Sequence, residues 1–391
     1  MSISGTLWRC GRSAPPLWHL NSIMPLTHDA TERRLRLPLA MFLARVCAYQ
    51  RAAEPDDAFS HEAHESLKPT RGRMKNFFAG AALCLLPAVA IAADSAVAPP
   101  WAYPATDPGI QRERDDGSPK HVPGSDKAFT RQEVGNFFGV KDWFPNERPP
   151  MPDVVQNGHR PDVRACAGCH LPSGLGHPES ADLAGLPPEY FFQQVKEFQS
   201  GKRHNVLPAR SNGMVTIAKG MTDEEIKAAA AYFASLKPSS WVKIKETDTV
   251  PVTFVGGGNM RYVKPDGGNE PIGQRIIEVP EDAERADLRD THSGFVAYVP
   301  VGSIKQGEAM VTTGGNGKTI SCAVCHGPDL KGIGNVPGIA GLHPIYIVRQ
   351  LLDIQQGARD GSQTPLMKAV VAKLSEDDIV NIAAYVASRT P

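Results

Sequence analysis

The chain has 391 residues, which is enough for two or three domains that each bury a core of their own. Its hydrophobic content of 41% and charged content of 21% are typical of soluble globular proteins, and 42 basic residues balance 42 acidic ones. A zero net charge shows no basic surface of the kind that nucleic acid needs, so nucleic acid is not expected among the partners.

An export signal is predicted inside the chain, over residues 71–92. Three basic residues come first, a run of apolar residues follows, and the small residues Ala90 and Ala92 mark a cleavage site. The apolar run is short for a membrane span of about 20 residues, and Pro87 interrupts it, so a retained membrane anchor is the weaker alternative. We therefore expect a signal peptide at residues 74–93, cleaved near Ala92, and a periplasmic protein with no integral membrane span in the mature chain.

The signal divides the chain into a leader and a mature protein. Because Met74 begins the signal, residues 1–73 are predicted to be a leader from a start codon assigned too early, and to lie outside the fold. Three of the seven cysteines precede the cleavage site, so the mature protein keeps only four. An oxidising compartment normally pairs spare thiols as disulfides, and here none is spare, because all four lie in two short motifs.

Residues 94–151 form a proline-rich arm at the start of the mature chain. The arm ends in the sequence FFGVKDWFPNERPPMP, whose aromatic residues predict a strap that docks over a domain or a partner. A solvated linker with incidental aromatic residues is the alternative.

Two copies of the pentapeptide Cys-x-x-Cys-His follow, at residues 166–170 and 322–326. This is the sequence at which c-type haem is attached, with two thioether bonds from the thiols and an iron ligand from the histidine. A thioredoxin-like motif would need a βαβ context, and a zinc site would leave the histidine unexplained. We therefore expect two covalently attached haem c groups. The thioether residues are Cys166, Cys169, Cys322 and Cys325, and the iron ligands are His170 and His326.

The two motifs belong to a longer repeat. At a constant separation of 156 residues, the segments LAGLPPEY and IAGLHPIY share their glycine, leucine, proline and tyrosine, and the match continues after a three-residue shortening. The next segments, EYFFQQVKEFQSG and IYIVRQLLDIQQG, have the apolar spacing of an amphipathic helix that ends at Gly201 or Gly357. Two homologous helical domains are expected, at residues 152–245 and 301–391.

A capped helix is predicted to close each domain. Thr222 with Glu225, and Ser375 with Asp378, have the spacing of an N-cap hydroxyl and an acidic residue three positions later. Apolar residues at helical spacing follow each pair. The second domain therefore repeats the closing helix of the first.

Met214 and Met367 are predicted as the second axial ligands. They form the one Met or His pair after the motifs that occupies matched positions, and each is expected in a loop before the closing helix. A methionine at helical spacing is more often part of a core, but a thioether opposite histidine favours ferrous iron and raises the potential. Six-coordinate iron leaves no open position for a substrate, which favours electron transfer over catalysis.

In combination, these residues resemble the class I cytochromes c, and in particular the two-domain diheme cytochromes of the c4 group. The resemblance covers residues 152–238 and 301–390, from the haem motif through G-x-R and the methionine to the AAYFAS or AAYVAS helix. Residues 246–300 depart from this pattern, because they contain strand-like runs separated by Gly, Pro and Asn turns. The expected fold is mainly α, with two homologous class I cytochrome c domains joined by an irregular, partly β insert and preceded by the arm.

The resemblance also implies two local contacts. Gly307 should pack against the closing helix near Tyr385, where only glycine allows a close approach, and Gly158 is its counterpart in the first domain. A carbonyl oxygen after each motif should accept the proton of the haem-ligating histidine. Pro337 supplies this carbonyl in the second domain, and its counterpart in the first domain is Ala181.

Arg203 and Arg359 follow the matched glycines after the middle helix. A guanidinium there would pair with a haem propionate, and a solvated surface arginine is the alternative.

The function favoured by these features is single-electron transfer by a periplasmic diheme cytochrome, as a soluble carrier or as the cytochrome subunit of a dehydrogenase. The expected partners are redox proteins: a dehydrogenase, an oxidase, or a small cytochrome or copper protein. The chain itself is expected not to be an enzyme. One alternative is a diheme cytochrome c peroxidase, which needs a displaceable ligand at one iron, and another is a haem-based sensor.

Overall fold

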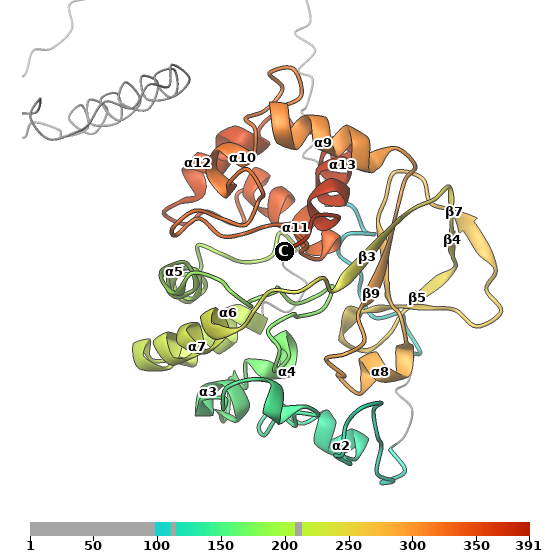
Figure 1. The fold of residues 1–391 in the computed structure, drawn as a ribbon, viewed down its shortest axis with the longest axis vertical. Coiled ribbons are helices and arrows are strands. Elements are labelled where there is room, and N and C mark those ends of the chain that lie inside the picture. Colours follow the sequence, from blue (N-terminus) through green and yellow to red (C-terminus); the bar gives the residue numbers. More distant parts are fainter. Residues whose placement is uncertain (1–97, 111–114, 208–212) are drawn as a thin grey trace, which may run out of the picture. The chain divides into compact units, whose positions relative to one another are not determined.

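The structure is a computed structural model in which three stretches of the chain are described (Figure 1): residues 98–110, 115–207 and 213–391. The predicted leader at residues 1–73 and signal at residues 74–93 lie outside the described residues. Residues 90–391 belong to one compact unit, and all that follows concerns the described part of that unit. Within it, no helix has the length and apolar character needed to cross a membrane.

The first repeated domain is built from short helices, with one two-stranded hairpin. Its closing helix begins where the sequence predicts it, because the Thr222 hydroxyl accepts a hydrogen bond from the Glu225 N–H and the Glu225 carboxylate accepts one from the Thr222 N–H. The middle helix packs on the two helices that follow it. The elements are α3 (Asp153–Gln156), β1 (Gly158–His159), β2 (Val163–Arg164), α4 (Ala167–His170), α5 (Pro188–Gln199), α6 (Gly213–Gly220) and α7 (Asp223–Ser235).

The second repeated domain, orange to red in Figure 1, has the same order of helices with a longer first helix. Ser375 and Asp378 form the matching capping box at the start of its last helix. Gly357 follows the middle helix with φ +79°, as Gly201 does in the first domain with φ +75°. The elements are α9 (Ser303–Thr313), α10 (Ala323–His326), α11 (Pro344–Gln355), α12 (Thr364–Val371) and α13 (Glu376–Ala387).

Helices α9 and α13 approach each other closely at Gly307. A Cβ atom at this position would lie 1.9 Å from the carbonyl oxygen of Asn381 and 2.7 Å from the Cβ of Tyr385. This confirms the packing expected for Gly307. Gly158 has a different role, because it lies in strand β1 at φ +58°, where a Cβ would meet the carbonyl oxygen of Val163 at 2.2 Å. The first domain has no helix as long as α9 before its motif, so its glycine serves a tight hairpin instead.

The insert between the domains is the β-rich part of the described chain, as its sequence predicts. Strand β3 leaves the first domain and pairs in parallel with β9, which leads into the second domain, and β8 pairs with β9 antiparallel. Two further antiparallel pairs, β4 with β7 and β5 with β6, form separate two-stranded sheets. The elements are β3 (Val242–Glu246), β4 (Thr249–Pro251), β5 (Thr253–Val255), η3 (Gly257–Asn259), β6 (Arg261–Val263), β7 (Asn269–Pro271), β8 (Ile277–Pro280), α8 (Ala283–Asp287) and β9 (Phe295–Val299).

The arm packs along the protein itself. It contains helix α2 (Arg131–Val134) and the 3-10 turn η2 (Pro145–Glu147). The buried Tyr103 hydroxyl donates to an Asp353 carboxylate oxygen at 3.0 Å, and Trp143 Nε1 donates to the Leu288 carbonyl at 2.6 Å. The described part of the arm therefore contacts the second domain through Tyr103 and the insert through Trp143.

Candidate haem sites

The first Cys-x-x-Cys-His motif forms one helical turn, α4, with Cys166 at its N-cap. His170 at the end of this turn is buried, and its Nδ1 lies 2.8 Å from the carbonyl oxygen of Ala181. Because a carbonyl only accepts, Nδ1 carries the proton and Nε2 keeps its lone pair for a metal. Burial also lowers the pKa of His170, which favours the neutral, ligating form of the ring.

The second motif repeats this geometry in helix α10. His326 Nδ1 lies 2.8 Å from the carbonyl oxygen of Pro337, and burial lowers the pKa of His326 as well. Both carbonyl partners are those that the repeat predicts. Each histidine contacts a main-chain carbonyl oxygen, which does not depend on the side chain. Ala181 can therefore accept the hydrogen bond in the first domain, as Pro337 does in the second.

The four motif cysteines are free thiols within the described chain. Burial raises the pKa of Cys166 to about 12 and that of Cys322 to about 11. The described residues hold no cluster of three or more His, Cys, Asp or Glu side chains that could bind a metal ion. Covalent attachment of haem at these thiols is the expectation that the Cys-x-x-Cys-His pattern itself carries.

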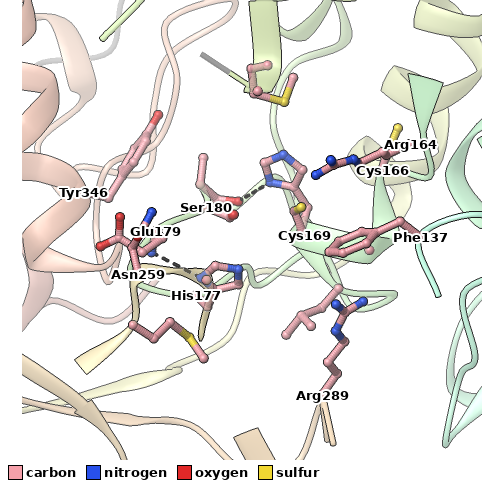
Figure 2. Close-up of a pocket in the computed structure, with 18 of the residues that line it drawn as sticks. Phe137, Arg164, Cys166, Cys169, His177, Glu179, Ser180, Asn259, Arg289 and Tyr346 are labelled. Atoms are coloured by element: carbon pink, nitrogen blue, oxygen red, sulfur yellow. Dashed lines mark hydrogen bonds between the residues drawn. The ribbon is translucent and has the colours of Figure 1, made fainter. Parts of the chain in front are cut away.

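A cavity of about 1240 Å³ adjoins the first motif (Figure 2). Cys166, Cys169 and His170 reach it from one side, and Met214 of α6 also lines it. Ordinary small-molecule sites measure about 300–1,000 Å³, so this space is large enough for a bulky cofactor. Apolar side chains complete much of the wall: Leu183, Leu186, Phe191, Val195 and Ile217. The residues present therefore fit a haem group in the first domain.

The two candidate axial methionines lie in helices, not in the loops expected from the sequence. Met214 is the second residue of α6 and Met367 lies in the first half of α12. Both are half-buried, and Met367 packs against the core of the second domain. Glycine and proline near these positions mark the beginnings of short helices, which explains why the sequence resembles a loop there.

The insert and the arm also contribute to the first cavity. Asn259 and Met260 of the insert line it, as does Phe137 of the arm (Figure 2). The sequence placed Phe137 in the aromatic segment expected to dock, but did not assign it to this site. Asn259 and Met260 were missed, because they lie outside the repeat and have no counterpart in the second half.

Phe137 covers the first motif directly. A Cβ atom at Gly168 would lie 2.6 Å from the Phe137 ring, and the guanidinium groups of Arg164 and Arg289 lie 5.2 and 4.6 Å from the ring centre (Figure 2). The residue that matches Gly168 in the second motif is Val324, which is 66% exposed. The arm therefore covers the edge of one motif and leaves the edge of the other open.

Arg203 and Arg359 meet at the boundary between the two repeated domains. Their main chains form an antiparallel β-bridge, and each side chain reaches the tyrosine and the glutamine of the other domain at matched positions. Arg203 is only 8% exposed, so the solvated-surface alternative is wrong for it. The hydrogen bonds join Arg203 to Gln194 (2.7 Å), Tyr346 (3.1 Å) and Gln350 (2.8 Å), and Arg359 to Gln350 (3.2 Å), Tyr190 (2.8 Å) and Gln194 (2.9 Å).

This arginine cluster carries excess positive charge beside the first cavity. The tyrosine and glutamine side chains that accept hydrogen bonds from the two arginines are neutral, and behind them the buried Glu197 carboxylate accepts from Gln194 at 3.1 Å. Burial disfavours the Tyr190 phenolate, but Arg359 and Arg203 outweigh it and lower the pKa of Tyr190. Arg203 lines the cavity itself. The cluster is therefore suited to an anionic group at this end of the cavity.

Matches to known proteins agree with this geometry. The family model described as Cytochrome c matches residues 156–237 and 305–390. Cytochrome c4 of Azotobacter vinelandii is 31% identical over 232 residues, which span 56% of this chain and 82% of that protein. The thiosulfate dehydrogenase electron acceptor of Thiomonas intermedia (strain K12) is 26% identical over 233 residues, which span 59% and 80%. The solved structure of reduced cytochrome c4 from Pseudomonas stutzeri matches 57% of this chain and 93% of its own, at 22% identity and a TM-score of 0.38.

The repeated haem motifs, their histidine contacts, the family match and the similarity to cytochrome c4 of Azotobacter vinelandii define a c-type cytochrome, a protein that carries covalently bound haem c. Within that class, the chain belongs to the diheme class I cytochromes of the c4 type. It is a diheme electron carrier or the cytochrome subunit of a dehydrogenase.

Proposed function

We propose that the protein is exported to the periplasm, holds one haem c in each repeated domain and passes single electrons between redox proteins without catalysing a reaction of its own. The observation that carries this proposal is the repeated histidine geometry, in which His170 and His326 each place Nδ1 2.8 Å from a carbonyl oxygen eleven residues later. When bound, haem supplies an iron that gains or loses one electron.

The chain's own residues would act as follows in this proposal. Cys166 and Cys169 hold the first haem, and Cys322 and Cys325 hold the second. The neutral imidazoles of His170 and His326 and the matched Met214 and Met367 would hold the irons, and retention of both protein ligands during electron transfer would leave no place for a substrate. The common cavity of His170 and Met214 supports this assignment for the first domain.

The electron donor is proposed to be a dehydrogenase. Two relatives, from Thiomonas intermedia and Stutzerimonas stutzeri (strain A1501), are electron acceptors of thiosulfate dehydrogenase, at 26% and 24% identity. Another relative is the cytochrome subunit of sulfide dehydrogenase from Chlorobaculum tepidum, at 30% identity over 102 residues. A dehydrogenase of inorganic sulfur compounds is therefore the first donor to assay.

Electron transfer predicts a definite response to peroxide. We expect the mass of the holoprotein to include two haems, and both irons to be low-spin at rest. The reduced protein should resist carbon monoxide. It should also transfer electrons to an oxidised cytochrome or copper protein faster than it turns over hydrogen peroxide. Stopped-flow spectroscopy on the reduced holoprotein compares the two rates. Rapid peroxide turnover together with a high-spin iron would instead establish the peroxidase alternative.

Arg203 and Arg359 are proposed to pair with haem propionates at the boundary between the domains. Arg203→Leu and Arg359→Leu should each lower the potential of at least one haem, because removing a buried positive charge destabilises the added electron. Redox titration followed by visible absorption measures both potentials. Lys202→Leu is the matched control, since it removes one exposed positive charge next to Arg203. Unchanged potentials in both arginine variants would refute the assignment.

A further inference from the structure

A buried acid–base cluster lies where three segments of the protein meet. His343, directly before α11 in the second domain, is 0% exposed. Its Nδ1 lies 2.5 Å from Glu278 Oε1 in strand β8 of the insert. On the other side of the ring, Nε2 lies 3.7 Å from Oδ1 of Asp182, which belongs to the loop after the first haem motif. The imidazole is therefore held between two carboxylates from different parts of the chain.

Three atoms of this cluster are buried without a hydrogen-bond partner among the described residues: Asp182 Oδ1, Glu278 Oε2 and His343 Nε2. A buried polar atom without a partner is costly, and a buried net charge costs more. The cluster has a net charge of minus one if both carboxylates are ionised beside an imidazolium. One additional proton makes the cluster neutral. The cluster therefore favours proton uptake whenever the electrostatic field around it becomes more negative.

The proton affinity of Asp182 lies in the range where uptake occurs near neutral pH. Burial raises the pKa of Asp182 to about 7. Burial opposes the charged form of His343, but Glu278 and Asp182 outweigh it and raise the pKa of His343. Among the described residues, His177 also interacts electrostatically with His343, and burial lowers the pKa of His177 well below its usual range, so that it stays neutral.

The remaining surroundings of the ring add little charge. Arg349, on the helix that His343 precedes, forms an ion pair with Glu179 at 2.9 Å. The Phe295 ring meets the imidazole edge-on, with the ring centres 5.2 Å apart. The proton balance of the cluster is therefore set mainly by its own two carboxylates.

The cluster is connected to the first haem site through a single peptide unit. Asp182 directly follows Ala181, whose carbonyl oxygen accepts the hydrogen bond from His170 Nδ1 at 2.8 Å. An electron added in the first domain makes the field at this loop more negative and raises the proton affinity of nearby groups. The matched positions in the repeat hold Gly338 and Pro187 in place of Asp182 and His343, so the second domain has no equivalent cluster.

We propose that the Asp182–His343–Glu278 cluster takes up one proton from solvent when the first domain accepts one electron from a redox protein donor, so that electron and proton transfer are coupled in this domain alone. The proton binds between the Asp182 carboxylate and the His343 imidazole, and it is released when the acceptor reoxidises the first domain. The proposal rests on haem binding by the first domain, and it adds a proton-transfer role to the electron-transfer function.

The sign of the effect follows from linkage. If the reduced form binds the proton more tightly, protons favour reduction, and the potential of the first domain falls as the pH rises through the pKa of the cluster. One proton per electron changes the reduction equilibrium at most tenfold for each pH unit, which corresponds to about 59 mV. The potential of the second domain should change much less over the same range.

The test begins with the wild-type holoprotein. Spectroelectrochemical titration between about pH 5 and pH 9 should show a sloping potential for one haem, and a pH-indicator dye in weak buffer should show proton uptake on reduction. A flat potential without uptake would overturn the proposal for the unaltered protein. If electrons still passed to a cytochrome or copper protein, the electron-transfer function would stand.

Variants then locate the proton. Asp182→Asn should remove the slope and the uptake while both haems remain bound, and Glu278→Gln should shift the pH range of the slope. Asp329→Asn is the matched control, because it removes an exposed carboxylate from the corresponding loop of the second domain. If the Asp182→Asn slope equals that of wild type, other groups, such as haem propionates, bind the proton and the proposal is wrong.

Discussion

Gly307→Ala is expected to destabilise the second domain by about 3 kcal/mol. The new Cβ would lie 1.9 Å from the carbonyl oxygen of Asn381. That contact involves main chain inside α13, so no side chain can turn away to relieve it, and helices α9 and α13 must separate. Their separation would expose apolar surface from a core that includes the fully buried Ile379 and Val380. Denaturant unfolding of the holoprotein, followed by circular dichroism, gives the free energy of unfolding.

The matched control for this variant is Glu308→Ala, the next residue of the same helix. Its side chain is exposed, so the same new residue should change the free energy of unfolding by less than about 0.5 kcal/mol. Equal effects of the two substitutions would show that the close helix crossing does not limit residue size at Gly307.

Met214→Ala and Met367→Ala should each abolish the sulfur-to-iron charge-transfer band of one haem, which is about half of the total band intensity if each of two haems has one methionine ligand. Each variant should also lower the potential of its own domain, because loss of the thioether removes a ligand that favours ferrous iron. Absorption at the red edge of the visible spectrum and redox titration measure both effects while the fold is retained.

Two other methionines in the first cavity provide the controls. Met260 of the insert lines the same space as Met214, and Met221 lies in the core before helix α7. Met260→Ala and Met221→Ala should keep the full band. If Met260→Ala lost the band and Met214→Ala kept it, the ligand of the first haem would be Met260 of the insert, and the assignment of Met214 would be wrong.

Much of the domain structure could be predicted because its causes are local. The capping boxes at Thr222 and Ser375 need only residues three positions apart. The carbonyl partners of the two histidines come from a loop eleven residues later, and the repeat identified both. Gly307 could be placed against α13 because the family resemblance supplied the position of the contact.

The sequence was less informative where a contact joins distant segments. The Phe137 contact with Gly168 and the Glu278 contact with His343 both involve residues outside the repeat, so comparison of the two halves could not reveal them. The helical positions of Met214 and Met367 were missed for a different reason, since glycine and proline at the first turn of a short helix resemble a loop. In the first two cases, tertiary packing produced a contact that the local sequence pattern does not indicate.

The boundary around Arg203 and Arg359 has the form of a homodimer interface. Each arginine bonds to partners in the other half at matched positions, so one patch meets a copy of itself, as in a two-fold symmetric dimer. Here the two copies are halves of one polypeptide. The contact is therefore intramolecular and does not depend on protein concentration, unlike the same contact in a dimer. The same substitution made in either half meets equivalent partners in the other half.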